Sequence, residues 1–354
     1  RGGLLLSCWM WPRWVRGYFV VRKAIQRGQA SGQMEARPPD ILFVGHVLPL
    51  GIIAYLLRKR VPYVVFTHGM DVLMAQKSWR KRWLLKKILT HAQVVVANSE
   101  FTKRQILDIR NLKLEIQPVV VYPCPTIATD IKRENVEALW RKLGLTGKKV
   151  LLTLGRVVER KGHDLVIKAL PEILQHVPEV VYVVAGDGSD LERLQALMSS
   201  PRKRGSSDSD SRHIVDSRIR GNDKIRQGSQ SAVRFVGTIS DDERPLYYAL
   251  CDLFVMPSRQ IGPDVEGFGL SFLEAAVFGK PSIGGRSGGV PEAILHGKTG
   301  VLVDPYDVGA LARAVVQLLH DDALRENLGQ NAKTRVLKEF NYTVQLEKLL
   351  YGIT

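Results

Sequence analysis

Basic residues with the chemistry to bind phosphate stand at one strand–helix junction in the second half of the chain. Arg156 directly follows a predicted strand, and Lys161 lies at the start of the next predicted helix. A strand end beside a helix N-terminus is a ready site for an anion. A guanidinium binds phosphate as a planar fork and an ammonium as a point charge. We therefore expect Arg156 and Lys161 to bind one phosphate group from two sides; the alternative is a surface turn with exposed basic residues.

Two glutamates eight positions apart, Glu266 and Glu274, form a second candidate cluster. Gly267 and Gly269 allow backbone N–H groups to approach a ligand closely. A helix predicted to begin near Leu270 directs its positive end to the same place. Carboxylates accept hydrogen bonds from hydroxyls, so the pair could bind a sugar and a ribose. The alternative is a charge at a helix N-terminus together with an unrelated surface glutamate.

Two further glycine-rich turns follow predicted strands. One spans 284–292, and the other is Gly186-Asp187-Gly188. A dinucleotide site needs the spacing Gly-x-Gly-x-x-Gly directly after a strand. Gly186 and Gly188 lack the third glycine of that pattern, so NAD binding is disfavoured.

Strand and helix patterns alternate along the chain, which is typical of α/β folds with buried parallel sheets. Short apolar runs predict a first series of strands at 41–44, 63–67, 93–97 and 116–122. A second series is predicted at 150–154, 180–185, 233–237, 253–256, 281–284 and 300–303. Two doubly wound halves follow, with ligands expected at the carboxyl ends of their strands. The serine-rich, basic segment 199–232 cannot bury a core, so we expect a disordered surface loop, with an RNA- or lipid-binding loop as the alternative.

The composition of the 354 residues excludes several classes of protein. With 45% hydrophobic and 24% charged residues, the chain is neither disordered nor collagen-like and can form two domains. Cys8, Cys124 and Cys251 lie far apart, so they form no disulfide framework or metal-ligand spacing, and a reducing compartment is expected.

Most of the net charge of +16 lies in the first third, because residues 1–110 carry 19 Lys/Arg against five Asp/Glu. The segment 77–87 is the most basic run, and tryptophan beside Lys/Arg suits the headgroup layer of an anionic membrane. The alternatives are a solvated basic face or a nucleic-acid site, and no known nucleic-acid motif supports the second. No segment is long enough to span a bilayer, and a cleaved signal peptide is disfavoured. The residues expected to contact the membrane are Trp79, Arg80, Lys81, Arg82, Trp83, Lys86 and Lys87.

At these residues the chain resembles the retaining glycosyltransferases of family 4, which have the GT-B fold of two Rossmann-like domains with a cleft between them. The resemblance runs from about residue 38 to the end, outside the insertion. The segments that fit the family in order and spacing are 154–162, 233–258, 266–274, 287–292 and 297–305. The stretch 256–283 further resembles bacterial mannosyltransferases that act on phosphatidylinositol-type lipids.

The resemblance implies a role for each matching residue. Arg156 and Lys161 would bind the donor diphosphate, Glu266 would contact the hydroxyls of the transferred sugar, and Glu274 would hold the nucleotide ribose. In the motif Thr67-His68-Gly69-x-Asp71, His68 would line the cleft near the reacting sugar; the alternative is a capping or core histidine. His46 has a weaker claim to the same cleft. The backbone amides that would meet the distal phosphate or the sugar belong to Gly267, Phe268, Gly269 and Leu270.

The same resemblance implies the domain organisation. We expect a partial acceptor-side domain over 1–125, a connection over 126–149, a nucleotide-sugar-binding domain over 150–336, and a terminal helix over 337–354 that returns to the first domain. The family opens with a strand and a glycine-rich loop that nothing before Ile41 supplies. The first domain is therefore expected to lack roughly 60–90 residues, and full activity would not be expected of so incomplete a chain.

The function expected from these observations is a retaining hexosyltransferase on the cytoplasmic face of the membrane. It would move a sugar from a nucleotide-diphosphate donor to an acceptor hydroxyl of a lipid or cell-envelope glycan. No metal or cofactor is expected, since Arg156 and Lys161 would take the part that a divalent metal plays elsewhere. The alternatives are another GT-B enzyme, such as a sugar-nucleotide epimerase or a phosphorylase, or a catalytically vestigial protein that binds membranes or polyanions.

Overall fold

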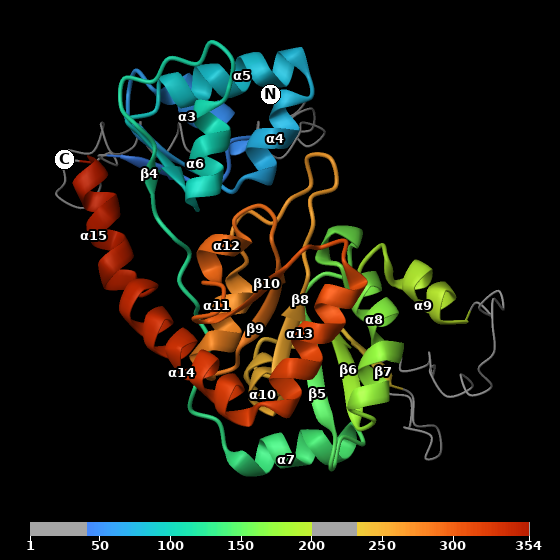
Figure 1. Cartoon of the computed structure of the whole chain (residues 1–354). Coiled ribbons are helices and arrows are strands. Elements are labelled where there is room, and N and C mark those ends of the chain that lie inside the picture. The colour runs from blue at the N-terminus through green and yellow to red at the C-terminus, as the bar shows by residue number, and fades with distance from the viewer. Residues whose placement is uncertain (1–40, 200–231, 354) are drawn as a thin grey trace, which may run out of the picture. The chain divides into compact units, whose positions relative to one another are not determined.

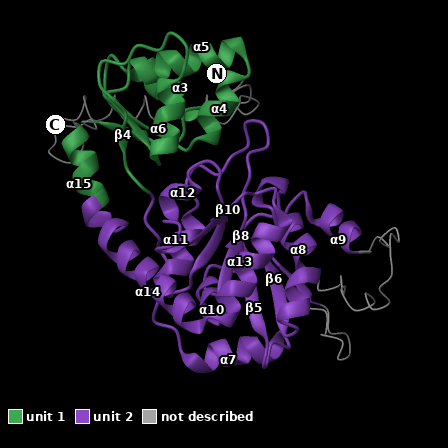
Figure 2. Ribbon diagram, viewed as in Figure 1, with its two compact units in different colours: residues 1–122, 345–354 green, residues 123–344 purple. Residues whose placement is uncertain are grey.

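The computed structural model describes residues 41–199 and 232–353, which fold into two compact units (Figure 1). Unit 1 is formed by Arg1–Tyr122 and Gln345–Thr354, and unit 2 by Pro123–Val344 (Figure 2). Each unit is built on one parallel sheet with helices on it, which confirms the predicted α/β class. Our expectations for residues 1–40 and for the serine-rich insertion lie outside the described residues.

The described part of unit 1 has a sheet of strand order β1-β2-β3-β4, in which every pair is parallel. Its strands are β1 (Leu42–Val44), β2 (Tyr63–Thr67), β3 (Val94–Ala97) and β4 (Val119–Val120). Its helices are α3 (Leu50–Leu57), α4 (Met70–Gln76), α5 (Trp79–Thr90), α6 (Glu100–Leu107) and most of α15 (Tyr342–Ile353).

Successive side chains of these strands point to opposite faces of the sheet. Tyr63 and Val65 pack with Leu85 and Ile88 of α5 in one apolar cluster. Val64, on the opposite face, packs with Leu349 of α15. The C-terminal helix therefore covers the second face of this sheet, and Tyr122 N donates to Gln345 Oε1 at 2.8 Å beside it.

Unit 2 has a parallel sheet of strand order β10-β9-β8-β5-β6-β7. The strands are β5 (Lys149–Leu154), β6 (Val180–Ala185), β7 (Val233–Gly237), β8 (Leu253–Met256), β9 (Ser282–Gly285) and β10 (Gly300–Val303). The order runs outward in both directions from β5 and β8. In such sheets the crevice at the carboxyl ends of the two central strands is the usual ligand site. The loops after β5 and β8 carry Arg156, Lys161 and Glu266.

Helices cover both faces of this sheet. Leu253 and Val255 of β8 share a cluster with residues of α8 (His163–His176) and α13 (Val308–His320), and Phe254 between them packs against Tyr248 of α10 and Phe272 of α11. The remaining helices are α7 (Arg133–Lys142), α9 (Leu191–Ser199), α10 (Arg244–Leu250), α11 (Leu270–Val277), α12 (Val290–Ala293) and α14 (Asp322–Glu339). No helix of the described ranges is both long and apolar enough to cross a bilayer.

Three local differences from the sequence-based expectations have physical causes. The strand expected at 116–122 is reduced to β4, because Pro118 offers no backbone N–H to a neighbouring strand. Helix α8 begins at His163, one residue later than expected, because Gly162 adopts the left-handed conformation (φ 76°) after a short 3-10 turn, Glu159–Lys161. Helix α4 was not predicted, and it follows β2 directly after Gly69.

Candidate functional site

Glycines bring the loops at the carboxyl edge of the unit 2 sheet into direct contact. A Cβ on Gly162 would overlap the carbonyl oxygen of Pro257, and one on Gly186 would overlap that of Gly155. The loops after β5, β6 and β8 therefore touch through their main chains, an approach that only glycine permits at these positions. This contact gathers the side chains predicted to bind the donor.

Lys161 is buried in this crevice and is already paired. Its Nζ lies 2.7 Å from Oε2 of Glu266 and 3.1 Å from the sulfur of Met256. Burial lowers the pKa of Lys161, and the Glu266 charge opposes that effect. Arg156, in contrast, is exposed, although it lies close enough to act on the Lys161 ammonium. The structure thus places one predicted phosphate ligand inside the crevice and leaves the other open to solvent.

Arg160 is a buried member of the cluster that the sequence-based reasoning did not select. Its Nη1 donates to Oε2 of Glu266 at 2.6 Å, and its Nε forms an ion pair of 2.8 Å with Oδ1 of Asp264. Burial by itself would raise the pKa of Glu266, but the charges and hydrogen bonds of Lys161 and Arg160 outweigh it and lower that pKa to about 2. The sequence shows only that Arg160 is a second basic residue on the turn of Lys161, which does not reveal that it pairs with Glu266.

Glu274 is buried, with 3% of its surface exposed, so the alternative of a surface glutamate is wrong. Its carboxylate is paired with Arg244 and accepts a hydrogen bond of 2.7 Å from the Tyr248 hydroxyl. Both partners come from α10, and Glu274 lies on α11, which begins after Gly269 in the left-handed conformation (φ 96°). Two donors therefore fix the orientation of this carboxylate.

The two additional glycine-rich turns support the loops that carry the charges. Gly289 N donates to the carbonyl oxygen of Glu266 at 2.9 Å. Val157 N donates to the carbonyl oxygen of Asp187 at 2.8 Å, next to Arg156. A Cβ on Gly288 would overlap the main chain of Glu266. These turns hold the backbone of the binding loops in place.

His68 in unit 1 is exposed, so the core-histidine alternative is wrong. It follows β2, and its Nε2 lies 2.8 Å from the carbonyl oxygen of Gly45, which can only accept, so Nε2 donates this hydrogen bond. Its main-chain N–H donates to Oδ1 of Asp71 at 2.9 Å. The ring of His46, which follows β1, lies 4.9 Å from the ring of His68. The structure thus places the two candidate histidines of unit 1 side by side.

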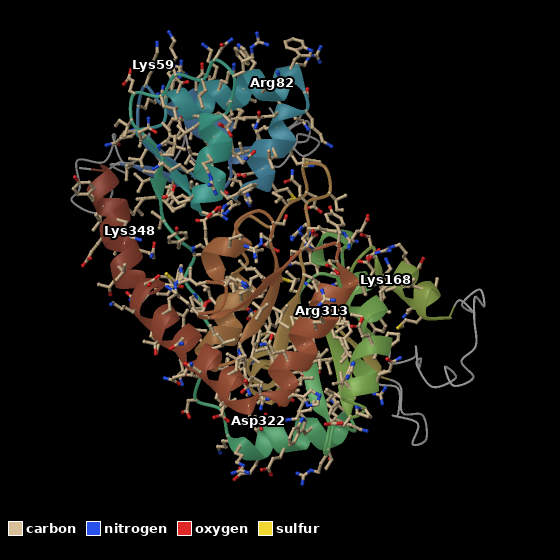
Figure 3. The ribbon with its side chains drawn as sticks, viewed as in Figure 1. Lys59, Arg82, Lys168, Arg313, Asp322 and Lys348 are labelled. Carbon is tan, nitrogen blue, oxygen red and sulfur yellow. The ribbon has the colours of Figure 1, made fainter. Side chains whose placement is uncertain are left out.

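Helix α5 exposes five of the seven residues predicted to contact a membrane. Trp79 and Trp83 are 73% and 55% exposed, whereas Leu85, Ile88 and Leu89 face the unit 1 core. Arg80 and Lys87 stand over the rings of Trp79 and Trp83. Arg82, labelled in Figure 3, projects from the same helix. Lys81 is exposed as well, whereas Lys86 and Lys87 are half-buried.

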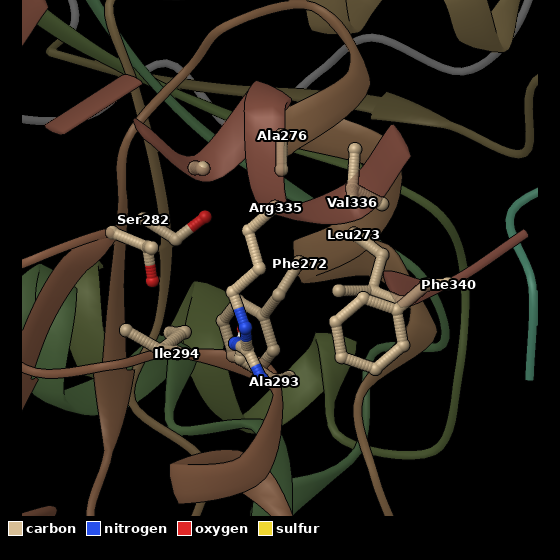
Figure 4. Close-up of a pocket in the computed structure, with 11 residues that line it drawn as sticks. Phe272, Leu273, Ala276, Ser282, Ala293, Ile294, Arg335, Val336 and Phe340 are labelled. Atoms are coloured by element: carbon tan, nitrogen blue, oxygen red, sulfur yellow. Dashed lines mark hydrogen bonds between the residues drawn. The ribbon is translucent and has the colours of Figure 1, made fainter. Parts of the chain in front are cut away.

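A small pocket lies away from these residues, between α11, α12 and α14 (Figure 4). Its lining is mostly apolar and includes Phe272 and Val336. Arg335 crosses it and donates to the carbonyl oxygens of Glu292 and Ala293 at the end of α12. The one charged side chain of its lining is thus bonded to the main chain of α12. Within the described ranges, no group of three or more His, Cys, Asp or Glu could hold a metal ion.

Comparison with protein families gives two matches. A model described as "Glycosyl transferases group 1" matches residues 148–321, and one described as "Glycosyl transferase 4-like domain" matches residues 1–125. The first covers the sheet of unit 2 with its carboxyl-edge loops. The second covers the sheet of unit 1.

Among curated relatives, the chain is similar to the GDP-mannose-dependent alpha-(1-6)-phosphatidylinositol monomannoside mannosyltransferase of Mycolicibacterium smegmatis. The two are 30% identical over 327 residues, which are 88% of this chain and 76% of the relative. A GDP-mannose-dependent enzyme for the monoacylated form of that lipid, from Corynebacterium glutamicum, is 27% identical over 95% of this chain and 82% of its own length.

Among solved structures, Anabaena HepE in complex with UDP-glucose is similar in fold. The TM-score is 0.71 at 21% sequence identity, with 94% of this chain and 81% of HepE covered.

Proposed function

The chain belongs to glycosyltransferase family 4, and on that basis we propose the substrates and the residues with which it transfers a hexose from a nucleotide-diphosphate donor. The donor is GDP-mannose and the acceptor is a hydroxyl of a mannosylated phosphatidylinositol lipid. The similarity to GDP-mannose-dependent enzymes over most of both chains carries this proposal. UDP-glucose is not preferred, since HepE shares only the fold at its level of identity.

The donor diphosphate binds to Arg156 and Lys161. The support is chemical and positional: both follow β5 at the central crevice of a doubly wound sheet, where ligands of such sheets bind. As the bond from the sugar to the diphosphate breaks, negative charge grows on the leaving group. Positive groups held beside the bound donor stabilise this charge more than they stabilise the bound substrate, and the barrier falls.

Glu266 orients the hydroxyls of the transferred sugar, and Glu274 holds the ribose. Two observations support these roles: both carboxylates are anchored by other side chains, and each retains acceptor capacity for a hydroxyl. The amides of Gly267, Phe268, Gly269 and Leu270 face the distal phosphate or the sugar at the start of α11. His68 contacts the transferred sugar, and its exposed position after β2, beside the ring of His46, supports that role.

The basic helix α5 rests on an anionic membrane surface, so that the enzyme is peripheral on the cytoplasmic face where its lipid acceptor lies. The exposed tryptophans and the adjoining cations support this placement. Each basic residue near such a surface contributes about 1 kcal/mol. Replacing Arg80, Lys81 and Arg82 by serine is thus expected to weaken binding to phosphatidylglycerol vesicles about 100-fold. The matched control replaces the exposed Arg104, Arg110 and Lys113 of unit 1, and equal loss in both variants would refute the assignment to α5.

Product analysis tests the transfer itself. The protein is incubated with radiolabelled GDP-mannose or UDP-glucose and with phosphatidylinositol monomannoside in mixed vesicles. We expect a labelled lipid product from GDP-mannose alone, and its loss in Glu266→Gln. A labelled epimer or sugar phosphate without a glycoside would favour another GT-B activity. Binding to vesicles without binding of GDP would favour a vestigial site.

A further inference from the structure

The carboxylate of Glu266 has two cationic partners on one oxygen. Arg160 Nη1 and Lys161 Nζ approach Oε2 at 2.6 and 2.7 Å. All three side chains are at least 87% buried. Removing a partner from a buried charge is costly, because the remaining charge is neither paired nor hydrated. Two cations on one carboxylate let one of them leave without that penalty.

The two cations differ in how firmly they are held. The guanidinium of Arg160 lies between two acids: its Nη1 donates to Glu266, and its Nε forms an ion pair with Asp264 that lacks hydrogen-bond geometry. The Arg160 carbonyl accepts a hydrogen bond of 2.8 Å from Arg259 N, which also fixes its backbone. Lys161 has Glu266 and the weakly accepting sulfur of Met256 as partners. An ammonium with three donors on a flexible stem can turn toward another anion.

We propose that Arg160, anchored by Asp264, is the positioning residue that holds the Glu266 carboxylate in place when Lys161 turns to the donor diphosphate. This inference rests on the proposed role of Lys161 in binding the donor. Without Arg160, Lys161 would be the sole counterion of Glu266, and the diphosphate and the carboxylate would compete for one ammonium. With Arg160 present, Lys161 can bind phosphate while Glu266 stays ionised and oriented toward the sugar.

The charged groups around Glu266 come from two loops. Arg160 and Lys161 belong to the loop after β5, and Asp264 precedes Glu266 on its own loop. The glycine turn after β9 contributes a main-chain bond from Gly289 N to the Glu266 carbonyl. The low pKa of Glu266 arises from Lys161 and Arg160 acting against burial, so loss of Arg160 should raise it.

Carboxyl titration of Glu266 tests this positioning without requiring any substrate. Glutamate is labelled with 13C at the side-chain carboxyl, and Glu266→Gln assigns the signal. In Arg160→Gln the titration of Glu266 should move upward by at least about one pH unit, the size of a lost close charge partner. Arg160→Lys should restore most of the shift. Arg160→Met, which keeps the apolar stem of the side chain but removes its charge, should move it in the same direction and serves if Arg160→Gln fails to fold. Glu159→Gln, an exposed neighbour, is the matched control and should leave it unchanged.

Transfer kinetics provide the second readout. Arg160→Gln should lower kcat more than it raises the KM for GDP-mannose, with a new acidic limb in the pH profile, and Arg160→Lys should recover kcat. An unmoved Glu266 titration in Arg160→Gln, or a raised KM at unchanged kcat, would overturn the inference and make Arg160 a structural or direct donor ligand. If the wild type neither binds GDP nor transfers mannose, the proposed function fails, whereas the titration still decides whether Arg160 holds Glu266.

Discussion

The hydroxyl of Tyr248 donates a hydrogen bond of 2.7 Å to Oε2 of Glu274, and both groups are buried between α10 and α11. Burial is the main cause that raises the pKa of Tyr248, and the adjacent Glu274 charge raises it further. The phenol therefore remains a donor throughout the physiological range. Arg244 pairs with the other oxygen of the same carboxylate. The proposed ribose ligand is thus oriented by a neighbouring helix before any nucleotide arrives.

Tyr248→Phe is expected to lower the free energy of unfolding by about 1.5–3 kcal/mol, the range for a hydrogen bond to a charged group. Chemical denaturation at neutral pH measures it. Tyr247→Phe is the matched control, because Tyr247 is a buried neighbour outside the Glu274 cluster. Equal losses in the two variants would show that the Tyr248 bond contributes nothing specific.

Arg156→Ala is expected to lower kcat about 100- to 1000-fold, as for removal of one group that stabilises developing charge. The melting temperature should not change, since the side chain is exposed. Mannose transfer and a thermal melt on one preparation test both parts. Lys298 is an exposed cation before the amino end of β10, whereas Arg156 follows the carboxyl end of β5. Lys298→Ala should therefore retain full activity. Near-normal mannose transfer by Arg156→Ala would show that Arg156 does not bind the donor diphosphate.

The buried imidazole of His163 makes the stability of unit 2 depend on pH. Its Nδ1 lies 3.0 Å from the Tyr182 hydroxyl, and burial, reinforced by the Lys161 charge, lowers its pKa to about 4. Below pH 6.5 the unfolded chain binds a proton that the folded protein does not, so stability falls as the pH falls. We expect a loss of about 2 kcal/mol between pH 7 and pH 5.

His163→Gln should remove that part of the pH dependence, measured by denaturation at pH 7, 6 and 5. His176→Gln, at the exposed end of the same helix, should keep most of it. An unchanged slope in His163→Gln would assign the acid sensitivity to other groups.

Gly289→Ala is expected to lower kcat/KM about 100-fold through a shift of the Glu266 loop, the cost of misplacing a catalytic group by about 1 Å. The backbone of Gly289 suits any residue, but a Cβ there would overlap the carbonyl oxygen of Gly267. Steady-state kinetics detect the change. Gly309→Ala in α13 meets the end of the flexible Arg313 side chain and Asp307 Oδ1 at an ordinary contact distance, and should be active. A fully active Gly289→Ala would mean that the turn does not hold the loop.

Local patterns predicted much of the fold. The strands β2, β6, β7, β8 and β10 have the bounds that their apolar runs predicted. Buried parallel strands are continuous β-branched runs, a signal that needs no distant partner. Helix α4 was missed because it is a short segment whose helical state depends on packing of Val72 and Ala75 into the unit 1 core.

The sequence by itself determined which residue types stand at the ends of which strands, and so the choice of Arg156, Lys161, Glu266 and Glu274 as candidates. Glycines and apolar runs specify such junctions locally. Only the tertiary structure decided how these side chains are paired. Arg160 and Glu266 are 106 positions apart, and they meet because β8 lies beside β5 in the sheet. Strand order is set by the packing of the whole unit, so no local pattern could have identified Arg160 as the second counterion of Glu266.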